Sequence, residues 1–280
     1  MPDIFDLTEH EVDMNGWVRY PEDAKWRREV FDPESMRHIA KANLFMIQDI
    51  YKYVSKPGDT IMDIMSGTGS LMIAAVDPEP RNVVLIEIEE PYHKLQLSSL
   101  KKIQDTNGDK LGSIINIHSN CNDILPLPCD HIIFSPPYAK ILKSKPKSES
   151  TLYIAGTTMA PKTSDGQSGE SWADYFSTDG NVGNLDKFMY NMKMTQMYQL
   201  CYQSIRPGGT LSVILKDYTL KGKRVYLSDW LNKTCHAAGF ELYAWFKRYS
   251  PGTGFLRLWK SRGLEVVEDE DIVVYRKPST

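Results

Sequence analysis

Residues 57–75 read PGDTIMDIMSGTGSLMIAA, a segment in which a turn, an apolar run, a glycine-rich loop and a second apolar run follow one another. The run Ile61–Ile64 has the length and composition of a short buried strand. Glycines at positions 67 and 69 allow the backbone to turn sharply and to approach a ligand without a Cβ in the way. The segment therefore predicts a strand that ends in a ligand-binding loop, with a helix beginning near Leu71.

Three further apolar runs follow, and each of them ends in polar residues. They are Asn82–Ile86, Ile114–His118 and Ile132–Phe134. Short apolar runs of this kind are typical of strands buried in a parallel sheet. Open α/β sheets place their chemistry at the carboxyl ends of such strands.

The third of these runs leads directly into Ser135-Pro136-Pro137-Tyr138. Proline has no N–H to donate, so the strand cannot go on pairing beyond Ser135. The backbone must leave the sheet in a stiff, extended corner. That corner leaves a hydroxyl, a free carbonyl and an aromatic ring at the carboxyl end of a strand.

The Ser-Pro-Pro-Tyr corner resembles the catalytic motif of the amino-methylating DNA methyltransferases, and the D-x-x-x-G-x-G loop from Asp63 resembles the S-adenosylmethionine loop of Rossmann-like methyltransferases. The resemblance covers about residues 30–280 and implies an α/β fold of the Rossmann-like methyltransferase type. We expect a mostly parallel twisted sheet with a C-terminal antiparallel hairpin and helices on both faces. Residues 1–55 are expected to be helical and to flank the cofactor pocket, and residues 56–280 to form the catalytic domain.

The resemblance implies S-adenosylmethionine as the cofactor. Glu87 follows the glycine loop by about 20 residues, a spacing that suits hydrogen bonding to ribose hydroxyls, and Glu89 is the alternative. The adenine ring would lie at Asn120, where an Asp is more usual, with Asp123 and Ile124 beside it. The loop residues expected to hold the cofactor are Asp63, Met65, Ser66, Gly67, Thr68 and Gly69.

The family also implies a role for each residue of the corner. A flipped base would place its exocyclic amine between the side chain of Ser135 and the carbonyl of Pro136. Pro137 would keep the corner stiff, and Tyr138 would stack on the base. A Ser in the first place is typical of enzymes that methylate cytosine N4, so we expect a site-specific DNA methyltransferase that acts on that amine.

Three alternatives remain open. The first is N6 methylation of adenine in DNA, because the Ser is a tendency and not a physical requirement. The second is methylation of a base amine in RNA, and the third is a catalytically inactive module that binds cofactor, DNA or protein. A restriction endonuclease of the same system is a partner that such an enzyme can have, and the sequence leaves the recognition site and the oligomeric state open.

Residues 139–186 are rich in Lys, Ser, Thr, Gly and Asp, and a loop of this length is more often functional or disordered than incidental. We interpret it as an insertion that contributes to target recognition. Its basic residues would contact the backbone of double-stranded DNA, although a solvated loop that packs on the domain is equally compatible. These residues are Lys140, Lys143, Lys145 and Lys147.

The chain has 280 residues, four cysteines and a formal net charge of −3. The length suits one large α/β domain, and the net charge argues against a surface that binds nucleic acid everywhere. The cysteines form no CxxC pair and the histidines no ligand pattern, so we expect no metal. No signal peptide and no membrane-spanning apolar run is visible, which predicts a cytoplasmic protein. The resemblance to DNA methyltransferases implies that it is bacterial or phage-encoded.

Overall fold

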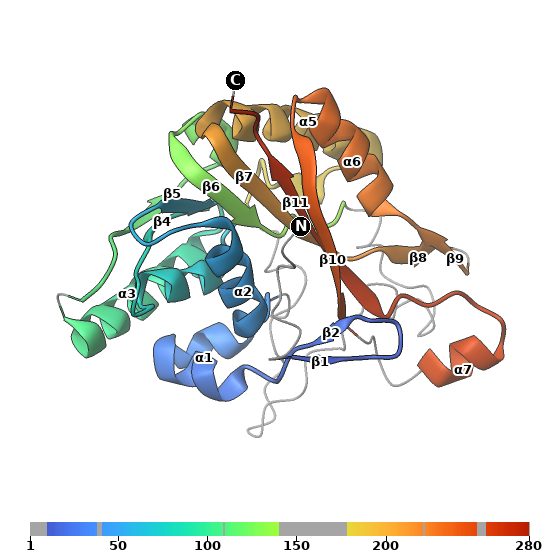
Figure 1. Ribbon diagram of the computed structural model, residues 1–280, viewed down its shortest axis with the longest axis horizontal. Helices are drawn as coiled ribbons and strands as arrows, with labels where there is room; N and C mark the ends of the chain where they lie inside the picture. The colour runs from blue at the N-terminus through green and yellow to red at the C-terminus, as the bar shows by residue number, and fades with distance from the viewer. Residues whose placement is uncertain are drawn as a thin grey trace.

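In the described part of the chain, nine strands form one mixed sheet, and helices cover both of its faces (Figure 1). The computed structural model describes residues 10–37, 41–108, 110–139, 178–220, 222–250 and 256–279. The strand order across the sheet is β1-β2-β10-β11-β7-β6-β3-β4-β5. These strands are β1 (Glu11–Val12), β2 (Val18–Arg19), β3 (Thr60–Asp63), β4 (Asn82–Glu87), β5 (Ile114–His118), β6 (Cys129–Phe134), β7 (Ile205–Leu215), β10 (Glu241–Tyr249) and β11 (Asp269–Arg276).

The helices form two layers, each with its own apolar core against the sheet. One layer contains α1 (Ala24–Val30), α2 (Leu44–Val54), the 3-10 helix η2 (Ser70–Ala75) and α3 (Glu90–Asn107). The other contains α4 (Cys121–Ile124), the 3-10 helix η6 (Val182–Asn184), α5 (Lys187–Ser204) and α6 (Leu227–Ala237). A separate hairpin is formed by β8 (Tyr218–Leu220) and β9 (Lys223–Val225).

The order of the strands creates a crevice between β3 and β6. From β3 the chain continues outward to β4 and β5 and then returns to β6 on the other side of β3, with all of these pairs parallel. Asp63 and Phe134, the last residues of β3 and β6, therefore lie on neighbouring strands at the same edge. Such a reversal point is where open α/β sheets bind ligands.

The remaining strands give the sheet an antiparallel end. β11 pairs antiparallel with both β7 and β10, as the resemblance implied. The expected α/β fold, with a parallel centre and a C-terminal antiparallel hairpin, is therefore confirmed. The two closing strands are not joined directly, however, because a short helix, α7 (Leu256–Ser261), lies between them in the chain.

The N-terminal segment combines two short strands with helices. The short strands β1 and β2 pair with each other, and β2 adds to the edge of the sheet beside β10. The helical spacing over residues 33–53 belongs to two elements, a 3-10 helix at Pro33–Arg37 and α2 from Leu44. Asn43 begins the second helix, because its side chain accepts hydrogen bonds from the N–H groups of Phe45 and Met46.

Glycine and proline explain two further differences. The expected helix after the glycine loop is the short 3-10 helix η2, and Pro78 disfavours helical backbone at the residue before it. Arg206-Pro207-Gly208-Gly209 has the composition of a turn but forms a bulge within β7, since β7 begins at Ile205 and its register with β6 shifts there. A Cβ on Gly209 would lie 2.1 Å from the carbonyl oxygen of Asp130, so only glycine fits.

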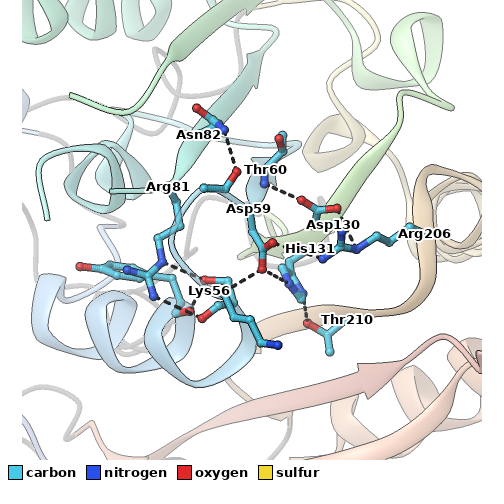
Figure 2. Close-up of polar contacts among 12 residues, drawn as sticks. Lys56, Asp59, Thr60, Arg81, Asn82, Asp130, His131, Arg206 and Thr210 are labelled. Atoms are coloured by element: carbon cyan, nitrogen blue, oxygen red, sulfur yellow. Dashed lines mark hydrogen bonds and ion pairs between the residues drawn. The ribbon is translucent and has the colours of Figure 1, made fainter. Parts of the chain in front are cut away.

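A polar group that we call the amino-end cluster ties the starts of β3, β6 and β7 together (Figure 2). His131, 5% exposed, lies between Thr210 and Asp59, with its Nδ1 2.9 Å from the Thr210 hydroxyl and its Nε2 3.3 Å from the Asp59 carboxylate. Arg206 joins Asp59 to Asp130, with N–O distances of 3.2 and 2.8 Å. The amino-end cluster lies at the opposite end of the strands from Asp63, and its role is structural.

Candidate active site

Backbone hydrogen bonds fix the glycine loop between the carboxyl ends of β3 and β4. The carboxylate of Asp63 accepts from the N–H of Met65 at 3.0 Å. The N–H and the hydroxyl of Ser66 both donate to the carbonyl of Ile86 on β4, at 3.1 and 3.0 Å. Gly69 has a φ of +80°, and a Cβ there would lie 2.8 Å from Cε of Met72. The tight backbone path predicted from the glycines is therefore present.

Two buried side chains bind the backbone of Gly67, one at its N–H and the other at its carbonyl. Glu87 accepts from the Gly67 N–H at 2.6 Å and, through its other oxygen, from the Glu89 N–H at 2.8 Å. Gln96 of α3 donates to the Gly67 carbonyl at 2.7 Å and to the Ser66 hydroxyl at 2.8 Å. Sequence analysis did not identify Gln96 as a site residue. Its place on the buried face of α3, four residues after Tyr92, is the signal that could have identified it.

Two adjoining cavities lie on either side of this loop, and Met65 and Gly67 line both. The first cavity is lined by Ile64, Met65, Gly67, Glu87, Ile88, Tyr92, Ser119, Asn120, Cys121, Pro137, Gly180, Asn181 and Val182. The second cavity is lined by Lys41, Ala42, Ile47, Asp63, Met65, Ser66, Gly67, Thr68, Ser70, Phe134, Ser135 and Ile214.

The structure thus brings most of the expected site residues together. Asp63, the loop residues 65–68 and Ser135 meet in the second cavity, and Glu87 and Asn120 meet Pro137 in the first. Lys41 and Ala42, which line the second cavity, belong to the N-terminal segment expected to flank the pocket, whereas the wall formed by residues 180–182 was not expected.

The segment expected to hold an adenine ring is a helical turn and not an irregular loop. Asn120 caps α4, since its side-chain oxygen accepts from the Asn122 N–H at 3.0 Å. This turn brings Cys121 to the wall of the first cavity. Asp123 is exposed, and neither Asp123 nor Ile124 lines either cavity.

The electrostatic signature of the site is a pair of acids without cations. Burial raises the pKa of Asp63 to about 7. Burial likewise raises the pKa of Glu87 to about 8, although backbone hydrogen bonds from Glu89 and Gly67 act in the opposite direction. None of the ion pairs found among the described residues includes either acid. The site therefore offers two acceptors to a ligand that brings its own donors.

The proline corner spans both cavities. Ser135 is exposed and lines the second cavity, whereas Pro137 lines the first. Burial raises the pKa of Tyr138, and the neighbouring acids Glu270 and Asp217 add to that effect. Tyr138 therefore lies beside the ends of β7 and β11 as a neutral phenol. Pro136 and Tyr138 are not lining residues of either cavity.

Lys216 and Arg224, two described basic residues near the corner, are both engaged with other groups of the protein. Lys140, Lys143, Lys145 and Lys147, the expected contacts to nucleic acid, lie outside the described residues. Lys216 is 9% exposed and donates to the Ser250 carbonyl at 2.6 Å. Arg224 pairs with Asp217 and Asp269, with N–O distances of 2.7 Å in both cases.

Two further properties concern only the part of the chain that the structure describes. No group of three or more His, Cys, Asp or Glu side chains in it is arranged to hold a metal ion. No helix in it combines the length and the apolar character that crossing a membrane requires.

Solved structures resemble this chain, although no protein-family model and no curated protein sequence matches it. Magnesium protoporphyrin IX methyltransferase (ChlM) from Synechocystis PCC 6803, solved with bound SAH, is 11% identical. The match covers 90% of this chain and 92% of that one, with a TM-score of 0.50. The [4+2]-cyclase SpnF is 12% identical over 85% of this chain and 81% of its own, with a TM-score of 0.51.

These likenesses establish the fold. The chain is an α/β protein with a cavity at the reversal point of its sheet. Its fold is the Rossmann-like fold of S-adenosylmethionine-dependent methyltransferases.

Proposed function

We propose that this chain is an S-adenosylmethionine-dependent methyltransferase that methylates N4 of a flipped cytosine in double-stranded DNA. The observation that supports this most is that Ser135 lines the same cavity as Asp63 and the glycine loop. The proline corner therefore adjoins the cavity in which a cofactor fits. The fold alone would not point to this reaction, because a methyltransferase and a cyclase both have it.

The residues of the two cavities fit this cofactor. Asp63, without a cation partner among the described residues, suits the ammonium group of the methionine part. Glu87 in the first cavity suits the two ribose hydroxyls, which would donate to its oxygens. Asn120 and Cys121 would then face the adenine. When bound, the cofactor supplies an electrophilic methyl group on a sulfonium sulfur.

The chain's own contribution would be to position the target amine. The lone pair of this amine is delocalised into the base, so the nitrogen is a poor nucleophile. The Ser135 hydroxyl and the Pro136 carbonyl would each accept a hydrogen bond from the amine and favour a pyramidal nitrogen. Ser135 is exposed, so the proton that the nitrogen loses has a path to water. Positioning and fixed dipoles would account for most of the rate enhancement.

Tyr138 would hold the extruded base by stacking on it. Flipping a base out of the duplex costs a few kcal/mol, and aromatic stacking recovers about 1–3 kcal/mol per base. A neutral phenol suits this role, because a phenolate beside Glu270 and Asp217 would be strongly disfavoured.

The proposal is tested by incubating the purified protein with labelled S-adenosylmethionine and unmethylated DNA or RNA, followed by nucleoside analysis. We expect N4-methylcytosine in the DNA. N6-methyladenine alone would show that the target base is adenine and would keep the enzyme class. A label found only in RNA would show that the substrate is RNA and not DNA. Cofactor binding without transfer to any nucleic acid would favour the inactive module.

Variants of Tyr138 test the corner in the same assay. We expect Tyr138→Ala to bind S-adenosylhomocysteine normally and to lose about ten- to hundredfold in turnover, the equivalent of one lost stacking contact. Tyr138→Phe is the matched control, because it keeps the ring and should keep most of the turnover. Equal turnover of Tyr138→Ala and the wild type would exclude Tyr138 from the base pocket.

A further inference from the structure

Glu89 is a buried acid whose side chain binds a segment far away in the sequence. It is 1% exposed and occupies the N-cap position of α3, where its side chain makes no capping hydrogen bond. Its carboxylate instead accepts from Thr178, through the N–H at 3.1 and 3.2 Å and through the hydroxyl at 2.7 Å. It also accepts from the side-chain amide of Asn181 at 2.7 Å.

These bonds hold residues 178–182, which we call the strap, against the first cavity. Gly180, Asn181 and Val182 of the strap line that cavity together with Glu87 and Asn120. Within the strap the Asn181 N–H donates to the Thr178 carbonyl at 3.3 Å, and the Asn181 side chain accepts from the N–H of Gly183, the next residue after the strap, at 2.9 Å. Apart from Glu89, the main polar tie to the cavity is a long 3.5 Å contact from Asn120 to the Gly180 carbonyl.

Glu89 itself is not among the residues that line either cavity. A ligand in the first cavity would therefore touch the strap but not the acid that holds it. Hydrogen bonds to a buried charged acceptor are stronger than neutral ones, and the N-terminus of α3 favours a negative charge at this position. Two features thus stabilise the charge of Glu89, namely the hydrogen bonds that the strap donates and the dipole of α3.

We propose that Glu89 is a positioning residue for cofactor binding, because it fixes the strap as the wall on which the nucleoside part of the cofactor rests. This inference rests on the proposed function. It assigns Glu89 a task different from ribose binding, for which Glu87 remains the residue in the cavity. Loss of the Glu89 charge should weaken cofactor binding without changing the chemistry at Ser135.

Isothermal titration with S-adenosylhomocysteine tests the inference. We expect Glu89→Gln to raise Kd about tenfold or more, because at least one donor of the strap then faces an amide N–H. The KM for S-adenosylmethionine should rise in parallel, with kcat at saturating cofactor unchanged. The control is Glu90→Gln, which removes an exposed charge from the same helix end, paired only with Lys94 among the described ion pairs, and should leave Kd unchanged.

A reciprocal exchange separates this role from a loss of fold. Glu89→Gln combined with Asn181→Asp reverses the donor and the acceptor of the 2.7 Å contact and should restore Kd to within about threefold of the wild type. If Glu89→Gln does not fold, Thr178→Val removes one donor with little change of shape and should still raise Kd.

Three results would overturn the inference. One is a folded Glu89→Gln variant with wild-type affinity, and another is an equal loss in Glu90→Gln. The third is a loss in Glu89→Gln that the reciprocal exchange does not recover. A wild-type protein that binds no S-adenosylhomocysteine would instead overturn the proposed function, and this inference with it.

Discussion

Asp63 and Glu87 end neighbouring parallel strands and form no ion pair with another described residue. Their raised pKa values mean that a substantial fraction of each carboxyl group is protonated near neutral pH in the free protein. A ligand that donates an ammonium group and hydroxyl groups favours the ionised forms. Binding of such a ligand must therefore release protons.

We expect the affinity for S-adenosylhomocysteine to rise between pH 6 and pH 8, by up to about tenfold per pH unit for each proton released. The pKa of Glu87 is about 8 in the free protein, and a ligand that donates hydroxyl groups to the carboxylate should lower it, which gives the sign of the dependence. Titration calorimetry in two buffers of different ionisation enthalpy measures the released protons directly. Glu87→Gln should flatten the dependence, and an affinity that is equal at pH 6 and pH 8 would contradict the assignment.

Among single residues, the sequence predicted those whose role can be inferred from their immediate neighbours in the chain. Gly67, Glu87 and Ser135 were recognisable because each follows an apolar run at a fixed spacing, and the structure places all three at the cavities. Gln96 and the strap were not recognisable, because their function depends on contacts across the fold. A polar side chain on a buried helix face signals that a contact exists but not what the partner is.

Among the elements, the amino-end cluster makes the parallel centre of the sheet sensitive to acid. Burial lowers the pKa of His131 below its ordinary value of 6.5, although Asp59 counteracts this. The folded protein therefore keeps His131 neutral where the unfolded chain would bind a proton. The stabilisation is complete above pH 6.5 and is lost as the pH falls below that value.

Thermal or denaturant unfolding between pH 7 and pH 5 should show this loss, with a slope of up to about 1.4 kcal/mol per pH unit from His131 alone. His131→Gln should be less stable at pH 7 but should show a flatter dependence on pH. His236→Gln, a change at an exposed position of α6, is the control and should keep the wild-type slope. An identical slope in all three proteins would exclude His131 as the source.

The elements themselves were predictable where a short apolar run is bounded by polar residues, as in β3, β4 and β6. They were not predictable where one capping residue or bulge decides the outcome. Asn43 divides what reads as one helix, and the bulge at residues 206–209 makes a turn-like motif part of a strand. The β8–β9 hairpin and the strands before residue 20 are too short to leave a periodic signal.

On the scale of the whole molecule, the four cysteines come together in one of the two cores. Cys121, Cys129, Cys201 and Cys235 are free, buried and part of the core between the sheet and the α5–α6 layer. Burial raises the pKa of Cys121 and Cys129 to about 12. Because the thiolate is the reactive species, we expect all four thiols to be inert in the folded protein.

An aromatic disulfide reagent releases one aromatic thiolate for each protein thiol that reacts. At pH 8 we expect almost no thiolate release from the native protein and four equivalents per chain in guanidinium chloride. Cys121 is the most informative of the four because it lines the first cavity. Any slow native reaction there should be suppressed by S-adenosylhomocysteine. A native thiol that reacts as fast as free cysteine would show that this core opens readily.

The corner at residues 135–137 belongs to the walls of both cavities, and two consecutive prolines limit its torsional freedom. A displacement imposed on Pro137 from one side cannot be absorbed locally, so it must reach the Ser135 hydroxyl on the other side. A compound that binds only the first cavity and pushes against Pro137 would then misalign that hydroxyl remotely. Inhibition would follow without any competition for the space in which the extruded base is held.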